Sequence, residues 1–464
     1  MNETTSELFL RLDKRDALGL RANLERELRV AIQSGRLGTG AALPSTRALA
    51  SDLGISRGVV VEAYEQLLAE GYLRAQQGSG TRVAARQQQR PLRADETSAP
   101  LIQFRFDFRP GLPDLSLFPR RAWLASTWRA MTEAPDAAFD YPDPRGAEEA
   151  RVAVAAYLNR ARATVAHPDR MLFSNGSAQG ITLVCRALFD RGVRSLAVED
   201  PGHADQCTDI RAAGLRTPRI PVDEQGIRVD RLRRSDARAV LVTPAHQYPT
   251  GAVLSADRRA ELLEWAAERD AIVIEDDYDA EYRYDREPIG ALQGLAPERV
   301  VYVGSASKML SPALRLGWLV LPAHLADAVA RAKLQIDRGS PVPEQLAFAD
   351  FINHGELDRH LRRTRPIYRR RRDALVAALA RHLPKLRIHG VAAGLHLLVE
   401  LRKGMDEAAI VEAARKESIR VYGAAPYRAK PHSGPPALVL GYGGLEENNI
   451  GDGVAHLARV LSRN

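Results

Sequence analysis

The sequence predicts a multi-domain protein with a small N-terminal head of three helices and a β-hairpin, followed by a larger α/β domain with a parallel sheet and a small α+β subdomain. Three observations predict this fold class. The 464 residues exceed what one hydrophobic core usually organises. The head shows helical spacing of apolar residues. Beyond residue 100, strand-like apolar runs alternate with helical stretches.

The composition is that of a globular protein with 45% hydrophobic and 27% charged residues, and its formal charge of +8 suits a polyanionic partner. The two cysteines, Cys185 and Cys207, have neither CxxC spacing nor a histidine cluster, so we expect no metal site and no disulfide framework. No apolar run approaches the length of a membrane span, and the N-terminus lacks the pattern of a secretory signal. The expected location is the cytoplasm, at the nucleoid.

The head reads as three helices in order. Leu20, Leu24, Leu28 and Ile32 are spaced four apart in a first helix over residues 19–34. The second runs from Ser45 to Gly54 and the third from Ser56 to Gly71, each with a serine cap and a terminal glycine. The segment "YLRAQQGSGTRVAA" then alternates around a Gly-Ser-Gly turn and predicts a hairpin. Together these elements predict a winged helix-turn-helix over residues 1–83.

Such a fold places the start of its recognition helix in the major groove of DNA. Ser56 and Arg57 stand at that start, and Arg47 lies early in the preceding helix, within reach of the phosphate backbone. Gly78 would let the tip of the wing approach the minor groove. Spacing alone leaves open a three-helix module for protein contacts.

Residues 84–100 are rich in Gln, Arg and Pro without periodicity, which predicts a linker before a domain at residues 101–464. The strand-like runs there include "AIVIEDD", "VVYVGS" and "LGWLVLP". From about residue 340, long charged helices and short strands predict the small α+β subdomain.

Two stretches of this domain carry reactive or anion-binding residues. In "GSASKMLSPALRLG", Lys308 directly follows the pair Ser305 and Ser307, and Arg315 lies seven residues further on, so an amine that can capture a carbonyl adjoins groups that can bind a phosphate. In "FSNGSAQGITLVCRALF", a strand turns through small residues into a helix near Ser177, whose N-terminus offers free N–H groups to a phosphate.

An acidic stretch completes the pattern. "AIVIEDDYDAEYRY" runs from an apolar strand into Glu275, Asp276 and Asp277 at the end where α/β folds bind ligands. A carboxylate there can hold the proton of a pyridine nitrogen, and Tyr278 can bond the phenolic oxygen of the same ring. Each motif alone also occurs in ordinary polar loops, but their order and spacing together indicate a pyridoxal cofactor.

Two family resemblances cover the chain. "LPSTRALASDLGISRGVVVEAYEQLLAEGYLRAQQGSGTRV" resembles the GntR family of winged-helix regulators, and residues 105 to 460 resemble the fold-type I aminotransferases that depend on pyridoxal 5′-phosphate. With "FDFRPGLPDLSLFPRRAW", "VEDPGH", "TPAHQYPTG" and "SASKMLSPALRLGWLV" in order, the whole chain resembles the MocR/GabR subfamily of GntR regulators. The resemblance implies operator binding as a homodimer, a pyridoxal 5′-phosphate cofactor and a small-molecule effector.

The resemblance also implies residue roles. Lys308 would hold the internal aldimine, Asp276 the pyridine nitrogen and Tyr278 the phenolate oxygen. Tyr141 would reach the phosphate from the neighbouring subunit, and His203 stands where an aromatic residue covers the ring. The remaining expected phosphate ligands are Ser177, Ala178, Gln179, Ser305, Ser307 and Arg315.

The chain departs from the family pattern at several of these positions. His203 replaces an aromatic residue that is commonly Tyr, and Tyr248 replaces the Asn of the aminotransferase NPTG motif. Val439 stands where aminotransferases place the arginine that binds the substrate carboxylate, and Arg428 is the nearest substitute. In the head, Val61 occupies a position where some members read a base with arginine.

These observations favour a transcriptional regulator that responds to pyridoxal 5′-phosphate or to an amine or amino-acid effector, with any turnover residual. An aminotransferase with a fused DNA-binding head is the alternative. One further feature is a run of eight arginines within residues 359–373. It is typical of a solvated helix face or a subunit contact, and an auxiliary contact to the DNA backbone is the second interpretation.

Overall fold

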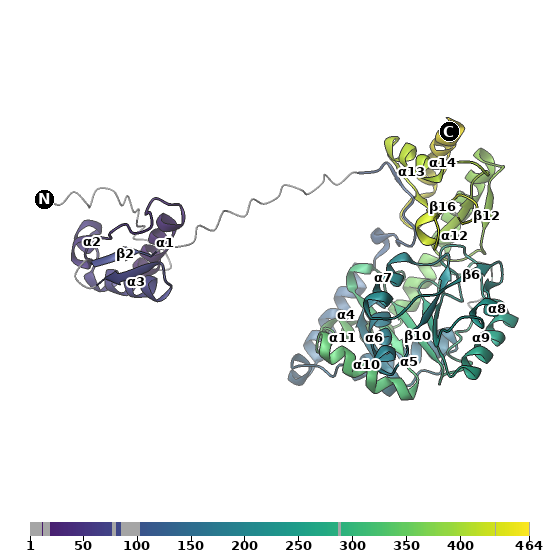
Figure 1. Ribbon diagram of the computed structural model, residues 1–464, viewed down its shortest axis with the longest axis horizontal. Coiled ribbons are helices and arrows are strands. Elements are labelled where there is room, and N and C mark those ends of the chain that lie inside the picture. Colours follow the sequence, from purple (N-terminus) through teal and green to yellow (C-terminus); the bar gives the residue numbers. More distant parts are fainter. Residues whose placement is uncertain are drawn as a thin grey trace. The chain divides into compact units, whose positions relative to one another are not determined.

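The computed structural model describes residue 12 and residues 19–76, 80–84, 103–285, 289–431 and 433–463. The chain divides into two compact units, Met1–Leu101 and Ile102–Asn464, each treated by itself below (Figure 1). The predicted wing residue Gly78 and residues 85–100 of the predicted linker lie outside the described residues. Within the described ranges, no helix is both long enough and apolar enough to cross a membrane.

The first unit confirms the predicted helices and hairpin. Ser45 and Ser56 cap the second and third helices by accepting the N–H groups of Ala48 and Val59, and Gly54 ends the second helix in the left-handed conformation. Leu24, Leu28, Val60 and Leu67 are buried in its core. The elements are α1 (Gly19–Gln33), α2 (Thr46–Leu53), α3 (Arg57–Ala69) and the antiparallel pair β1 (Leu73–Gln76) and β2 (Gly80–Val83).

The second unit is built on an eight-stranded sheet in the order β4-β11-β10-β9-β8-β5-β6-β7. The expected sheet is confirmed, but it is mixed rather than wholly parallel, because β11 runs antiparallel to both β10 and β4. The connection between β10 and β11 contains only the short turn Pro312–Leu314, and a parallel return needs a longer crossover. The strands are β4 (Met171–Asn175), β5 (Leu196–Asp200), β6 (Arg219–Asp223), β7 (Gly226–Ile227), β8 (Ala239–Val242), β9 (Ile272–Asp277), β10 (Val300–Ser305) and β11 (Leu316–Val320).

Helices cover both faces of this sheet (Figure 1). Alternate residues of β10 divide between them: Val301 and Val303 pack with the helices of one face, and Val300 and Tyr302 with those of the other. The first face carries α6 (Ser177–Asp190), α7 (Ala204–Ala212) and α10 (Ala323–Ile336). The opposite face carries α5 (Glu148–Arg162), α8 (Val229–Leu232), α9 (Ala256–Glu268), α11 (Val342–Asn353) and the first half of α12 (Glu356–His382).

The predicted α+β subdomain is confirmed in the C-terminal part. Its antiparallel sheet runs β12-β13-β16-β15. The segment that opens the unit joins this subdomain, because β3 (Phe106–Asp107) pairs with β14 (Ile419–Arg420). The other elements are α4 (Arg120–Glu133), β12 (Arg387–His389), β13 (His396–Glu400), α13 (Glu407–Lys416), β15 (Tyr422–Gly423), β16 (Ala437–Gly441), α14 (Glu447–Arg463) and the short 3-10 turns Leu115–Leu117, Asp136–Phe139, Pro168–Arg170 and Ala425–Tyr427.

Candidate functional site

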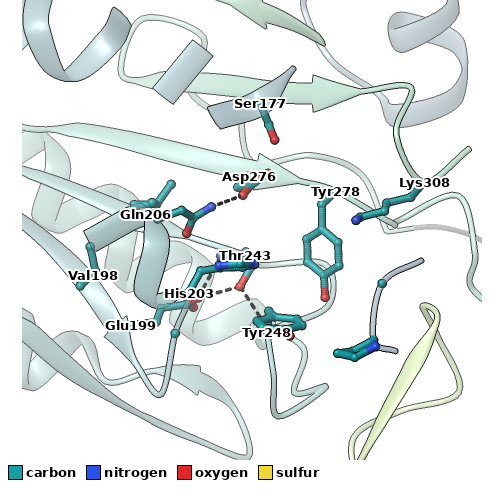
Figure 2. Close-up of a pocket in the computed structure, with 14 residues that line it drawn as sticks. Ser177, Val198, Glu199, His203, Gln206, Thr243, Tyr248, Asp276, Tyr278 and Lys308 are labelled. Carbon is teal, nitrogen blue, oxygen red and sulfur yellow. Dashed lines mark hydrogen bonds between the residues drawn. The ribbon is translucent and has the colours of Figure 1, made fainter. Parts of the chain in front are cut away.

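A cavity of about 150 Å³ lies at the carboxyl ends of β5, β8, β9 and β10, where α/β sheets bind ligands (Figure 2). Lys308, Asp276, Tyr278, His203 and Ser177, five residues that the sequence singled out, line it together. Tyr248, noted in the sequence at the NPTG position, also lines it, and residues that we did not predict complete its wall: Pro110, Gly111, Val198, Glu199, Gly202, Gln206, Leu241 and Thr243.

Lys308 follows β10 and points its amine into this cavity (Figure 2). A Cβ placed on Gly111 would meet Lys308 Nζ at 3.4 Å, so the backbone at Gly111 closes that side of the amine. Burial lowers the pKa of the Lys308 ammonium, against the attraction of Asp279 and Asp276, and Arg109 lowers that pKa further. A larger share of Lys308 is therefore neutral and nucleophilic than for a lysine in water.

Asp276 is the acid of the three-acid stretch that lines the cavity. Gln206 Nε2 donates a 2.7 Å hydrogen bond to its Oδ2, while Oδ1 is buried without a partner among the described residues. Burial raises the pKa of Asp276 to about 6, although the hydrogen bond from Gln206 acts in the other direction. A buried carboxylate with one free oxygen fits a protonated ring nitrogen.

The two neighbouring acids, Glu275 and Asp277, bond groups in the protein interior. Glu275 accepts the backbone N–H groups of Leu292 and Gln293. Asp277 forms a fully buried ion pair with Arg162 at 2.8 Å and accepts the hydroxyl of Tyr302. The structure thus has Asp276, the acid that the family resemblance singled out, in the cavity wall, and it gives Glu275 and Asp277 structural contacts that the sequence did not predict.

A second group of residues lies at the turn that begins α6, where the sequence predicted a phosphate site. Gly176 precedes the helix with φ 87°, and no side chain caps the first-turn N–H groups of Ser177, Ala178 and Gln179. The Arg315 side chain is exposed beside this turn and donates to the carbonyl of Asn175. The φ of Gly176 favours glycine, and a Cβ there would lie 2.7 Å from Arg315 Nη2, so the guanidinium would have to shift to admit another residue. Ser305 is buried at the end of β10, and Ser307 is half-buried.

The side-chain amide of Gln179 is already hydrogen-bonded within the protein. Its Oε1 accepts the N–H of Asn175 at 2.8 Å, and its Nε2 donates to Asp337 at 2.7 Å. Lys333, whose side chain is fully buried, also bonds Asp337 and Gln179. Only the backbone N–H of Gln179 therefore remains for a phosphate. We did not predict the ion pair between Lys333 and Asp337, although its i, i+4 spacing can be seen in the sequence.

Aromatic residues cover the cavity. The His203 ring stacks on Tyr248, with centroids 4.9 Å apart and planes 22° apart. The Tyr248 hydroxyl donates to Tyr427 at 3.0 Å, so the residue at the NPTG position bonds the small subdomain. Beside them, Glu199 accepts the Thr243 hydroxyl at 2.6 Å, and burial raises its pKa to about 7.

The structure gives no carboxylate-binding arginine at the expected place. Val439 is fully buried in β16, in one apolar cluster with Ala424 and Ala437. Arg428 donates to the Pro435 carbonyl and lines a separate cavity of about 550 Å³. Arg428 therefore does not reach the lysine cavity to substitute for the missing group.

Three predicted DNA-contacting residues of the first unit lie on its surface. Arg47, Ser56 and Arg57 are exposed, and Arg57 Nε lies 3.4 Å from Thr46 Oγ1 at the junction of α2 and α3. The Ser56 hydroxyl serves as the helix cap, and Val61 is half-buried.

The arginine run lies on α12 and divides by environment. Arg371 is buried against Asp114 at 2.7 Å, and Arg365 donates to the Glu281 carbonyl. Arg362 and Arg369 are exposed, consistent with a solvated or intermolecular face. Some arginines of α12 thus bond to other parts of the second unit, and others place positive charge on its surface.

A winged helix-turn-helix unit joined to an α/β unit with a partly buried lysine and a buried carboxylate in one cavity defines a DNA-binding protein with an aminotransferase-like domain. Residues 20–83 match the bacterial regulatory proteins of the gntR family, and residues 117–434 match aminotransferase class I and II. The chain belongs to the MocR/GabR type of GntR-family transcriptional regulators, which combines these two parts.

Full-length relatives have the same organisation. The chain is 31% identical to the "Probable rhizopine catabolism regulatory protein MocR" of Rhizobium meliloti, covering 97% of this chain and 95% of that one. It is also 31% identical to the pyridoxine biosynthesis transcriptional regulator PdxR of Corynebacterium glutamicum, covering 98% and 99%. The uncharacterized regulator YdeL of Bacillus subtilis is 32% identical over 94% and 95%.

Solved structures similar to the second unit are aminotransferases. The α-aminoadipate aminotransferase LysN of Thermus thermophilus, complexed with N-(5′-phosphopyridoxyl)-L-leucine, has a TM-score of 0.70 and 28% identity over 77% of this chain and 92% of that chain. The kynurenine aminotransferase of Pyrococcus horikoshii has a TM-score of 0.71 and 25% identity over 77% and 91%. The fold of the second unit is therefore that of fold-type I aminotransferases.

Proposed function

We propose that this regulator holds pyridoxal 5′-phosphate in the cavity around Lys308, and that the cofactor or an amine bound there changes its occupancy of operator DNA. The observation that carries the proposal is the convergence of three groups on one cavity: the buried amine of Lys308, the Asp276 carboxylate with its free oxygen, and the uncapped start of α6 beside Arg315. An aldehyde, a basic ring nitrogen and a phosphate each need one of them.

Pyridoxal 5′-phosphate supplies an aldehyde and an electron-accepting ring when bound. In this proposal the neutral amine of Lys308 binds the aldehyde, Asp276 holds the proton of the ring nitrogen, and Tyr278 bonds the ring oxygen. His203 covers the ring. The phosphate is held by the N–H groups and hydroxyls of Ser177, Ala178, Gln179, Ser305 and Ser307, and by Arg315.

The DNA-binding part of the proposal takes residues 1–83 as the reading head, residues 84–100 as a linker and residues 101–464 as the effector domain. Arg47 and Arg57, both exposed near the junction of α2 and α3, would contact the phosphate backbone and a base edge, with Ser56 and the wing residue Gly78 beside them. A small molecule acts on promoter occupancy only if it binds two conformations with different affinity. The protein would act in the cytoplasm, at the nucleoid.

A homodimer is part of the same proposal. Tyr141 is 86% exposed in a loop before α5, as expected of a residue that reaches a second subunit. Leu124, Trp128 and Met131 are exposed along one side of α4, and Phe139 is exposed next to Tyr141. A contiguous apolar surface of this kind is typical of a protein interface.

Catalysis of amino-group transfer is the second candidate. The intact lysine cavity favours it, and the chain is 30% identical to the 2-aminoadipate transaminase of Thermus thermophilus over 76% of this chain. The buried Val439 in place of a carboxylate-binding arginine argues for a regulator with little or no turnover.

The proposal is tested on the purified protein with added pyridoxal 5′-phosphate. We expect a yellow protein whose cofactor becomes fixed to Lys308 by borohydride, and a Lys308→Ala variant that lacks both the band and the label. Footprinting on the protein's own promoter, with and without the cofactor, then measures the effect on operator occupancy. An unchanged label in Lys308→Ala would refute the cofactor site.

A further inference from the structure

A buried group of three polar side chains lies directly behind Tyr278. Its members are His246, Asp279 and His396, each at most 2% exposed. One ligating atom of each lies within 4.8 Å of the others. None of these three residues is assigned a role by the proposed cofactor site, so the cluster needs an explanation of its own.

The cluster touches the cavity through Tyr278. The Tyr278 hydroxyl donates to the backbone carbonyl of His246 at 2.9 Å, and its oxygen lies 3.1 Å from His246 Nδ1. Tyr278 and Lys308 line the same cavity, with the lysine amine directed toward the tyrosine ring (Figure 2). His246 therefore fixes the side chain that faces the reactive amine.

Asp279 in turn fixes His246. Its Oδ2 lies 3.0 Å from His246 Nδ1, and a carboxylate at that distance selects the tautomer with the proton on Nδ1. Gly394, with φ 68°, makes this packing possible, because a Cβ there would lie 2.4 Å from Asp279 Oδ2 and from His246 Nδ1. The backbone thus fills the space around the pair, and little room remains for a metal ion between them.

His396 closes the cluster without adding a cation. Its ring lies 4.9 Å from the His246 ring, and neither of its nitrogens makes a well-formed hydrogen bond within the described residues, although the Pro249 carbonyl lies near enough to act on the ring. Burial, together with His246 and Lys308, lowers the pKa of His396 well below its ordinary value, against the carbonyl of Pro249. A neutral His396 leaves the Asp279 charge to act on His246 and Lys308.

The groups around Lys308 come from several elements. Asp279 and Asp276 attract its ammonium, and Arg109 repels it. The Lys308 charge also lowers the pKa of His203, which lines the cavity, and the pKa of His396, which lies behind Tyr278. Asp279 also acts on Asp276, whose pKa it raises, and on Tyr278, Glu281, Tyr284 and Tyr442.

We propose that Asp279 and His246 are positioning residues for Lys308: they fix Tyr278 in the wall of the cavity that the amine enters and supply a buried negative charge that attracts its ammonium, and so set the pH range in which Lys308 captures a carbonyl compound. This inference rests on the proposed cofactor site. The ammonium must first lose a proton to solvent. The neutral amine then condenses with the aldehyde, forming one carbon–nitrogen double bond and releasing one water.

The first test is Asp279→Asn, which keeps the shape and removes the charge. Without that charge Lys308 loses its proton more easily, so the pH midpoint for capture of pyridoxal 5′-phosphate by the cofactor-free protein should move down by about one unit. Stopped-flow absorbance across a pH series measures the midpoint. Asp270→Asn is the matched control, because Asp270 pairs with Arg299 at 3.0 Å just before the other end of β9.

The second test concerns the Tyr278 hydroxyl. His246→Leu removes the ring nitrogen near that hydroxyl and near Asp279, and we expect the dissociation constant of pyridoxal 5′-phosphate to rise roughly five- to tenfold. His246→Asn places an amide N–H near the position of Nδ1 and should restore affinity to within about twofold. A purely structural role for His246 would leave the two variants equally impaired.

Four outcomes decide the proposal. A lowered midpoint in Asp279→Asn with an unchanged Asp270→Asn supports it. A wild-type midpoint in Asp279→Asn, with normal folding by circular dichroism, overturns it. Stoichiometric Zn²⁺ in the wild-type protein that Asp279→Asn loses would also overturn it and make the cluster a metal centre. If the wild-type protein captures no pyridoxal 5′-phosphate at any pH, the proposed cofactor site itself fails.

Discussion

Gln206 Nε2 donates a 2.7 Å hydrogen bond to Oδ2 of Asp276, while the other oxygen of that buried carboxylate has no partner in the part of the chain that the structure describes. Gln206 lies on α7 and Asp276 on β9, so the bond joins a helix to the strand end at the cavity. One oxygen is thereby oriented and the other kept available. This relationship is what a ring nitrogen that must stay protonated requires.

The first prediction follows from that free oxygen. Asp276→Asn replaces a charged acceptor by a neutral amide, and hydrogen bonds to charged groups contribute about 1.5–3 kcal/mol. We expect the dissociation constant of pyridoxal 5′-phosphate to rise by at least about tenfold, measured by fluorescence titration of the cofactor-free protein. Asp270→Asn should bind like the wild type, and equal affinity of Asp276→Asn would exclude Asp276 as the ring partner.

The second prediction concerns DNA. Arg57 is exposed at the start of α3, so Arg57→Ala should weaken binding to the protein's own promoter by roughly 1 to 3 kcal/mol, the usual size of a good base contact. Mobility shift at moderate salt measures the loss. Arg186→Ala, which removes an exposed charge from α6, controls for net charge. Equal affinity of the wild-type protein for promoter and random DNA would contradict specific reading.

The local pattern of the sequence predicted the head well. The caps Ser45 and Ser56 and the left-handed Gly54 are decided by their immediate neighbours, and the structure has them where the pattern puts them. The order of motifs also predicted that Lys308, Asp276 and Ser177 meet, because the carboxyl ends of parallel strands share one edge.

Other parts of the cavity depend on contacts between distant residues and could not be read from the sequence. Tyr248 bonds Tyr427 from 179 positions away, and Gln206 bonds Asp276 from 70. The antiparallel direction of β11 was missed for a related reason, because an apolar run such as "LGWLVLP" predicts a strand but not its direction relative to its neighbours. The periodicity of a single sequence predicts helices and strands, whereas the order and direction in which strands pair depend on the whole fold.

The third prediction is a pH dependence of stability. Burial raises the pKa of Glu199 from its ordinary 4.5 to about 7, so between these values the folded state keeps a proton that the unfolded chain releases. The free energy of unfolding therefore falls as the pH rises through this window, by at most about 3 kcal/mol. Glu199→Gln should reduce this fall.

Urea unfolding of the cofactor-free protein at pH 5 and pH 7 measures the effect. The four tryptophans, Trp123, Trp128, Trp265 and Trp318, belong to the second unit, so their fluorescence reports that unit alone. An identical pH dependence in Glu199→Gln and in the wild-type protein would show that Glu199 does not hold this proton.

The fourth prediction concerns the apolar side of α4. Trp128 is 65% exposed there, and Trp128→Asp places a charge in the proposed subunit interface. We expect sedimentation velocity to show a dimer for the wild-type protein and a larger monomer fraction for the variant. Val165→Asp changes another exposed apolar residue, 53% exposed in the loop after α5, and should remain dimeric.

The last prediction concerns turnover. An aminotransferase orients its substrate by a bidentate arginine contact to the carboxylate, whereas Val439 is fully buried and Arg428 lines a different cavity. His203, stacked on Tyr248, also changes the cover of the ring. Ordinary α-amino acids should therefore be converted very slowly or not at all, while pyridoxal 5′-phosphate itself or an uncommon amine acts as the signal. A spectral assay with a panel of amino acids measures this, and turnover on the order of 1 to 10 per second with any of them would favour the aminotransferase function instead.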